Sequence, residues 1–167
     1  MPTPSAVLVP VFRDAGGELR LVLVRRAPGG PHGGQLGLPG GRWEPDDGSL
    51  LETALREAEE EIGLPRADVQ VVAELDALET RSTGFLVHPF LARITPPAEW
   101  RPAAGEISGI ITPTLAALAA ADARVELELE SRIVECILLG EDPPLWGLTL
   151  RLLDSLLPRL LGGEWPV

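Results

Sequence analysis

Residues 38–64 read LPGGRWEPDDGSLLETALREAEEEIGL, and our interpretation of the fold depends on them. A glycine turn leads into a short acidic loop, and the loop leads into a segment dense in carboxylates. At roughly 100° per residue, a helix here would carry one apolar stripe made of Leu51, Leu55, Ala58 and Ile62. The pattern therefore predicts an amphipathic helix that packs on a core, with Gly63 as its C-cap.

A second face of this helix would be acidic, because Glu57, Glu60 and Glu61 stand at i, i+3 and i+4. Like charges at this spacing repel by a few tenths of a kcal/mol per pair, roughly. A divalent cation would remove the repulsion, and Mg²⁺ prefers oxygen ligands that include carboxylates and substrate phosphates. The alternative is a solvated acidic face. The glycine pair 40–41 before the helix, and Arg56 and Gly63 around the glutamates, favour the metal site.

The stretch resembles the Nudix box, whose pattern is G-x5-E-x7-R-E-U-x-E-E-x-G-U, where U is a bulky aliphatic residue. The second half of the pattern matches from Arg56 to Leu64. The first half departs from it, since Asp47 stands near the position of the first glutamate and Gly48 occupies that position at strict spacing. The interval from Asp47 to Arg56 is one residue longer than the pattern. The role of Asp47 is therefore left open.

The resemblance implies an α+β fold, an α/β/α sandwich in which a mixed, curved β-sheet is flanked by the box helix and a C-terminal helix. It implies one Nudix domain over residues 1–167. Mg²⁺ or Mn²⁺ would be held by the three box glutamates, and Arg56 would orient them through its planar guanidinium. Glu106 is our candidate for a further glutamate that completes the metal site or acts as base. The alternative for Glu106 is a strand-end charge that faces water.

The segment from Leu21 to Gly41, LVLVRRAPGGPHGGQLGLPGG, is similar to the signature LLTxRSxxxRxxxGxVxFPGG of the Nudix branch that hydrolyses coenzyme A. Arg26 stands where that signature has serine, and Gly30 stands where it has arginine. The resemblance implies that this segment contacts substrate, and the candidate contacts are Arg25, Arg26, His32, Gly40 and Gly41. A plain strand connection with a loop histidine is the alternative.

The implied activity is metal-dependent hydrolysis of a nucleoside-diphosphate-linked substrate. For coenzyme A the products would be 4′-phosphopantetheine and adenosine 3′,5′-bisphosphate. Two alternatives stay open. One is a Nudix pyrophosphatase that acts on ADP-ribose, ADP-sugars or nucleoside triphosphates. The other is an inactive sensor that binds nucleotide.

Composition limits the partners and the location. The net charge of −11 argues against a nucleic-acid polymer as partner, so we expect a small nucleotide, with a homodimer left open. No stretch approaches the roughly 18 apolar residues of a membrane span, and the N-terminus has no basic segment before its apolar run. These features indicate a soluble cytoplasmic protein. The single cysteine, Cys136, lies in an apolar run and is predicted to be core.

Hydrophobic patterns predict the remaining elements. We expect strands at residues 6–12, 19–24, 35–38, 69–78, 85–94 and 106–111, with Pro89 marking an edge or a bulge. A helix is predicted to begin with Thr112 as N-cap and Pro113 at its first position. A hairpin should pair residues 124–129 with 132–139. The last helix is predicted to run to about Leu161.

Overall fold

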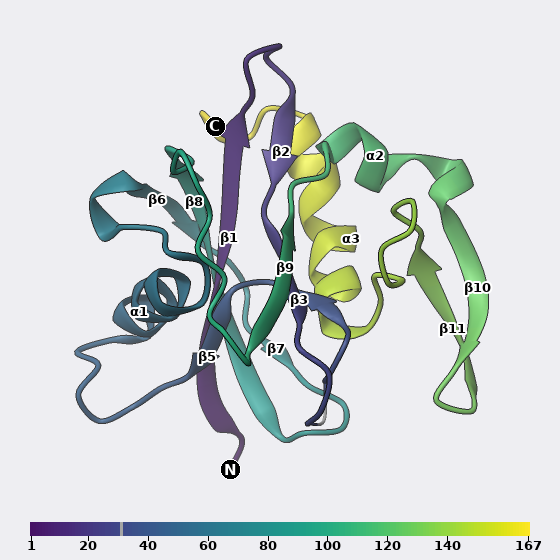
Figure 1. Cartoon of the computed structure of the whole chain (residues 1–167), viewed down its shortest axis with the longest axis horizontal. Coiled ribbons are helices and arrows are strands. Elements are labelled where there is room, and N and C mark those ends of the chain that lie inside the picture. Colours follow the sequence, from purple (N-terminus) through teal and green to yellow (C-terminus); the bar gives the residue numbers. More distant parts are fainter. Residues whose placement is uncertain (31) are drawn as a thin grey trace.

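The computed structural model describes residues 1–30 and 32–167. Its centre is strand β1 (Thr3–Arg13), which lies in a six-stranded sheet (Figure 1). β1 pairs in parallel with β8 (Phe85–Ile94) and antiparallel with β2 (Leu19–Leu21) and β5 (Gly40–Arg42). The sheet is therefore mixed, as the α+β prediction requires.

A smaller sheet lies beside the first and has the order β4-β3-β9. Its strands are β3 (Leu23–Arg26), β4 (Leu36–Gly37) and β9 (Ile107–Ile111), and both pairings are antiparallel. The prediction of one strand over residues 19–24 was wrong, because the chain leaves the first sheet after β2 and enters the second at β3. The strand predicted at 35–38 is short, and β5 was not predicted as a strand.

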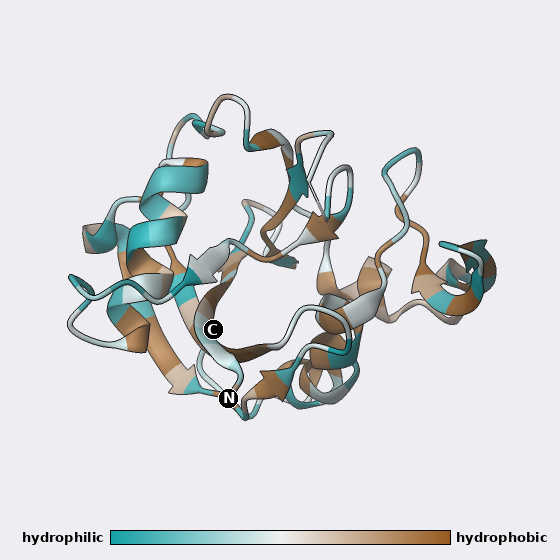
Figure 2. Ribbon diagram, turned by 90° about the horizontal axis from the view of Figure 1, so that it is seen from below, coloured by the Kyte–Doolittle hydropathy of each residue, from teal (hydrophilic) through white to brown (hydrophobic). Residues whose placement is uncertain are grey.

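Two helices cover opposite faces of the sheets. Along β1 the side chains alternate, so that Leu8 belongs to the core under α1 (Leu50–Ile62) and Val9 to the core under α3 (Gly147–Leu161). A strand buried on both faces reads as a continuous apolar run. Figure 2 shows hydrophobic colour along the central strands and hydrophilic colour on the turns of α1. The predicted α/β/α sandwich is confirmed.

Pro89 lies in an interior strand, because β8 has β1 on one side and β6 (Val69–Glu74) and β7 (Leu78–Glu79) on the other. The prediction of an edge was wrong. The Pro89 carbonyl accepts a hydrogen bond of 2.9 Å from the Leu75 amide, between the end of β6 and the start of β7. Since N–H and C=O of one strand residue point to the same side, the missing donor of Pro89 faces this interruption.

The C-terminal third begins with a helix whose start was predicted two residues too early. α2 (Leu115–Ala119) is capped by Thr114, whose hydroxyl accepts from the Ala117 amide at 3.1 Å. Thr112 and Pro113 are instead held by β2, since their carbonyls accept bonds from Arg20 and from the Leu21 amide. Tertiary pairing therefore overrides a good local cap signal.

A two-stranded hairpin projects beyond the helices (Figure 1). β10 (Arg124–Leu129) pairs antiparallel with β11 (Arg132–Ile137), and Cys136 is fully buried, as predicted. Short 3-10 turns occupy Arg66–Asp68 (η1) and Ala121–Ala123 (η2). Within the described ranges, each helix is too short or too polar to cross a lipid bilayer.

Candidate active site

Local signals at both ends fix the position of α1. The Ser49 hydroxyl accepts a hydrogen bond of 3.2 Å from the Glu52 amide, which satisfies one free donor of the first turn. Gly63 ends the helix with φ 69°, the left-handed conformation that glycine adopts without a Cβ clash. Between these caps Ala54, Ala58 and Ile62 are fully buried. The acidic residues are thereby held toward β5 and β3.

Glu61 is the buried acid of this face, with 2% of its surface exposed. Its Oε1 accepts a hydrogen bond of 2.8 Å from the Gly40 amide, and its Oε2 lies 3.4 Å from Nη1 of Arg26. Burial raises the pKa of the Glu61 carboxyl to about 7, against the opposing effects of Arg26 and the Gly40 amide. A carboxyl in this position can hold a cation or exchange a proton near neutral pH.

The two glycines of β5 allow the strand to approach β1 and α1 closely. A Cβ on Gly40 would lie 2.3 Å from the Ala6 carbonyl oxygen, and a Cβ on Gly41 would lie 2.2 Å from Oε1 of Glu57. The sequence analysis named both glycines as candidate substrate contacts. In this structure the Gly40 amide donates to Glu61, and the role of both glycines as substrate contacts stays a prediction.

Arg56 connects the acidic loop to the acidic helix. Its guanidinium binds Asp47 bidentately, at 2.8 Å from Nε to Oδ1 and 3.0 Å from Nη2 to Oδ2. Nη1 of the same side chain reaches Oε1 of Glu57 at 3.1 Å and Oε2 of Glu60 at 3.3 Å. One planar group therefore orients two of the three acids. The bonds from Arg56 hold the pKa of Asp47 well below its usual range.

Asp47 is the functional position that the sequence left open. Its side chain is buried, and besides Arg56 it accepts a hydrogen bond of 2.8 Å from the Thr53 hydroxyl. Asp47 has a shorter side chain than the glutamate of the Nudix pattern, and it lies one residue farther from the arginine. The ion pair between Asp47 and Arg56 still forms, at 2.8 Å. Asp47 therefore holds Arg56 in place without contacting the other acids.

The charges of the other acids influence one another. Burial raises the pKa of Glu57, Arg56 lowers it, and the charges of Glu60 and Glu106 raise it further. Glu106 is exposed in the turn before β9, and its charge also raises the pKa of Glu61. The structure thus brings Glu106 near the acids of α1, although its amino-acid position lies 45 residues or more away in the chain.

The donor set suits a hard divalent cation, because it consists of carboxylate oxygens around the buried Glu61. In the described part of the chain, no three acidic, histidine or cysteine side chains converge at one point. The reason is visible in their contacts, since Glu57 and Glu60 turn to Arg56 while Glu61 turns to Gly40 and Arg26. Binding a metal would require these side chains to turn. Their role as ligands stays a prediction.

The family follows from comparison with known proteins. A model of the NUDIX domain matches residues 2–129, which include α1 and all the acids described above. The chain belongs to the Nudix family.

Among curated Nudix relatives, a hydrolase named NudL from Yersinia enterocolitica is 43% identical over 91 residues, covering 54% of this chain and 45% of the relative. A NudL of Salmonella paratyphi B is 38% identical over 113 residues, covering 67% and 57%. The chain thus spans about half the length of these relatives.

Solved Nudix structures share the fold. A MutT/nudix family protein from Enterococcus faecalis gives a TM-score of 0.67 at 18% identity, covering 97% of this chain and 63% of that one. The NUDIX domain of Shewanella oneidensis NrtR, solved with ADP ribose, gives 0.63 at 18% identity, covering 96% and 89%. At these identities the similarity concerns the fold alone.

The candidate substrate contacts that precede the Nudix box do not lie together in the structure. Arg26 reaches Glu61, whereas Arg25 forms an ion pair of 2.6 Å with Asp142, which precedes α3. His32 is exposed in the loop after β3. No local pattern in the sequence indicates the role of Asp142, because its partner Arg25 lies 117 residues away.

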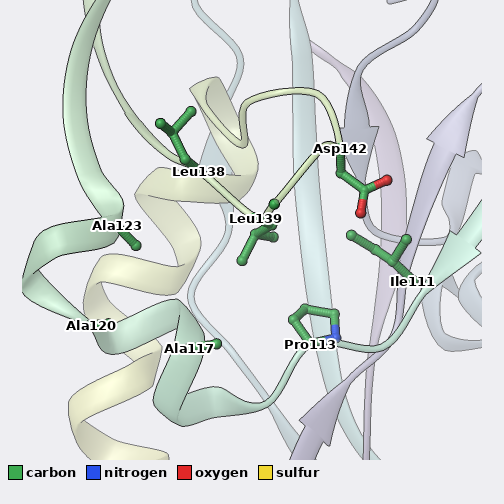
Figure 3. Close-up of a pocket in the computed structure, with 9 residues that line it drawn as sticks. Ile111, Pro113, Ala117, Ala120, Ala123, Leu138, Leu139 and Asp142 are labelled. Atoms are coloured by element: carbon green, nitrogen blue, oxygen red, sulfur yellow. The ribbon is translucent and has the colours of Figure 1, made fainter.

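Asp142 lies at the edge of a mostly apolar groove of about 420 Å³ (Figure 3). The groove lies between α2 and the segment that follows β11, and its lining includes Ile111, Pro113, Ala117 and Leu139. It is therefore next to Arg25, on a different side of β3 from the Nudix acids.

Proposed function

We propose that this protein hydrolyses a diphosphate bond in a nucleotide-linked small molecule, with Mg²⁺ or Mn²⁺ as cofactor. One observation carries the proposal. Arg56, held by Asp47, contacts Glu57 and Glu60 together, beside a buried Glu61 whose pKa is raised to about 7. A purely solvated acidic face would have no need for a buried acid or for an arginine fixed at its base.

Each residue has a role that its surroundings support. Glu57, Glu60 and Glu61 would hold the cation, which supplies positive charge to the phosphate oxygens and a more acidic water. Arg56 keeps two of these acids aligned. The proton of the attacking water would pass to a carboxylate, and Glu61 and Glu106 are the candidates because the charge of Glu106 acts on the Glu61 carboxyl.

Coenzyme A is the substrate we propose within this class. The support is the similarity of residues 21–41 to the coenzyme A signature, together with Arg25 and Arg26 at the end of β3. Arginine binds phosphate through paired N–H donors. Because the chain carries a net charge of −11, Arg26, which contacts Glu61, would be important for drawing an anionic substrate toward the acids.

A substrate panel tests the proposal. Coenzyme A, ADP-ribose, NADH, diadenosine polyphosphates and 8-oxo-dGTP would be incubated with the protein and Mg²⁺ or Mn²⁺, and products separated by chromatography. We expect coenzyme A to give the highest kcat/KM and to release adenosine 3′,5′-bisphosphate. If ADP-ribose, the ligand in the NrtR structure, ranks far above coenzyme A, the narrower proposal fails. Tight binding of a nucleotide without any product would indicate a sensor instead.

A further inference from the structure

Arg26 makes contacts that differ from those of its neighbour Arg25. Nη1 of Arg26 lies 3.4 Å from Oε2 of Glu61, and Nη2 donates to the Leu38 carbonyl at 3.4 Å. Its guanidinium lies against Gly37 of β4, where a Cβ would come within 3.7 Å of Nε and Nη2. A third of the Arg26 side chain is exposed, whereas Glu61 is 3% exposed. The arginine therefore covers the buried acid from the solvent side.

Successive side chains of a strand point to opposite faces, which separates Arg26 from Arg25, and the strand pairing beside them is irregular. In the β3–β9 pair, Arg25 is opposite Gly109 while Arg26 is opposite Ile107, so that Ser108 is skipped. The extra residue, Ser108, belongs to β9, and bulges of this kind are common beside functional sites. The Ser108 hydroxyl donates to the Arg25 carbonyl at 3.3 Å at the bulge. Consecutive arginines thus bind acids on different elements.

The contact between Arg26 and Glu61 has a simple electrostatic cause. An ionised carboxylate that is removed from water needs a nearby positive charge and hydrogen bonds. The Gly40 amide supplies one hydrogen bond, and Arg26 supplies the charge. A divalent cation bound to Glu61 would take the place of Arg26 as the positive charge beside the carboxylate oxygens. The cation would also repel the Arg26 guanidinium. Arg26 and a cation therefore compete for Glu61.

We propose that Arg26 is an internal counter-ion for Glu61, which occupies the acid when metal is absent and is displaced from it when metal binds. Displacement frees the guanidinium for an anionic group of the substrate beside the metal. The inference rests on the metal site of the proposed function and adds a positioning residue to it. Arg26 weakens metal binding in the empty enzyme and strengthens binding of the anionic substrate once metal is present.

The first test measures Mn²⁺ affinity by calorimetry and by the electron paramagnetic resonance signal of free Mn²⁺. In Arg26→Gln the competitor is gone, so we expect Mn²⁺ to bind at least about fivefold more tightly than in the wild type, the lower end of usual coupling between sites. Arg26→Lys keeps the positive charge and should stay near the wild-type affinity. Arg25→Gln removes a neighbouring charge that is paired with Asp142, and it should also leave Mn²⁺ affinity within about twofold.

The second test is the thermal midpoint with and without Mn²⁺. Arg26→Gln leaves Glu61 without its counter-ion, so the metal-free variant should melt below the wild type, and Mn²⁺ should raise its midpoint by more than it raises the wild type's. If Arg26→Gln does not fold, Arg26→Met would be used in its place in both tests. Methionine removes the charge but keeps an aliphatic side chain against Gly37.

The outcomes separate the two proposals. If the wild type binds Mn²⁺ and the Arg26→Gln or Arg26→Met protein binds it equally or more weakly, the counter-ion inference is overturned while the metal site stands. If neither the wild type nor any variant binds Mn²⁺, the metal site of the proposed function fails, and the inference fails with it. The counter-ion inference would also be overturned if Arg25→Gln bound Mn²⁺ as tightly as Arg26→Gln does. Such a result would mean that the loss of any nearby positive charge strengthens Mn²⁺ binding.

Discussion

Asp47 and Arg56 form the most complete interaction of the site. Both carboxylate oxygens accept from the guanidinium, and Thr53 and the Glu44 amide add two further hydrogen bonds to the same carboxylate. A charged group held in this way is a positioning element, because it fixes Arg56 and through it Glu57 and Glu60. Its effect should therefore appear both in stability and in the alignment of the acids.

Asp47→Asn should lower the free energy of unfolding at pH 7 by about 1–3 kcal/mol, the usual cost of leaving a charged hydrogen-bonded partner unmatched. Because the pKa of Asp47 is depressed in the folded state, its stabilising effect is present above the ordinary value near 3.8 and is lost as the pH falls below it. Urea denaturation at pH 7 and pH 3 would measure this. Asp46→Asn, at an exposed neighbour, is the control and should change little. Equal stability of the two variants at pH 7 would contradict the assignment.

Glu61 should make the stability of the metal-free protein depend on pH in the direction opposite to that expected for Asp47. Its pKa rises from 4.5 to about 7 on folding, so the folded state binds the proton more tightly than the unfolded state does. Stability in EDTA should therefore fall as the pH increases from about 4.5 to about 7, and level off above that. Glu61→Gln, whose amide oxygen can still accept from Gly40, should flatten this slope. Parallel curves for both proteins in thermal scans would show that Glu61 is not the group responsible.

At the scale of elements, the close approach of β5 to α1 is what places Glu57. Gly41→Ala would put a methyl group 2.2 Å from Oε1 of Glu57, and the flexible glutamate would have to move away. Displacement of a positioned group by about 1 Å can cost about a hundredfold in rate, so we expect a loss of that order in kcat/KM. The thermal midpoint should fall only slightly, because the atom that must move is at the end of a flexible side chain. Near-normal kcat/KM would indicate that Glu57 does not need its observed position.

The C-cap of α1 is a second property of this element. Gly63 has φ 69°, and a Cβ there would lie 2.8 Å from Cβ of Arg101. Gly63→Ala should therefore destabilise the protein by about 1 kcal/mol or more. Gly48→Ala is a matched control, since no atom lies within 4 Å of the Cβ it would add and no positive φ is recorded for it. Chemical denaturation of both variants measures the difference, and equal midpoints would count against a strained cap.

The elements also show which predictions the sequence supports. The end of α1 at Gly63 and its buried apolar side were predicted, because the periodicity and the C-cap glycine are local signals, whereas the start after Ser49 was not predicted. The predictions missed boundaries of strands and helices that are set by contacts with residues distant in the chain. The chain divides at Val22 because its two halves join different sheets, and Thr112 does not cap α2 because β2 pairs with that segment.

At the scale of the whole molecule, the layered fold was predictable because one helix motif implied its family's architecture. The site was predictable in part. The acids of α1 share a spacing that the sequence displays, but the pairs Arg26–Glu61 and Arg25–Asp142 join residues 35 and 117 positions apart. Such contacts depend on how the strands pair and how the sheets are stacked, and no local pattern records that. The assignment of residues 1–167 to one domain stays a prediction.

We expect the acids of α1 on the side of β5 to hold metal for diphosphate hydrolysis. Comparing Glu60→Gln with Glu59→Gln tests it most directly, because both residues are exposed neighbours on α1 and only Glu60 contacts Arg56. Initial rates of coenzyme A hydrolysis would be measured at saturating Mg²⁺, with folding checked by circular dichroism. Removing one ligand should lower the Glu60→Gln rate by about a hundredfold or more, while Glu59→Gln stays within about twofold of the wild type. Equal rates for the two folded variants would contradict the claim.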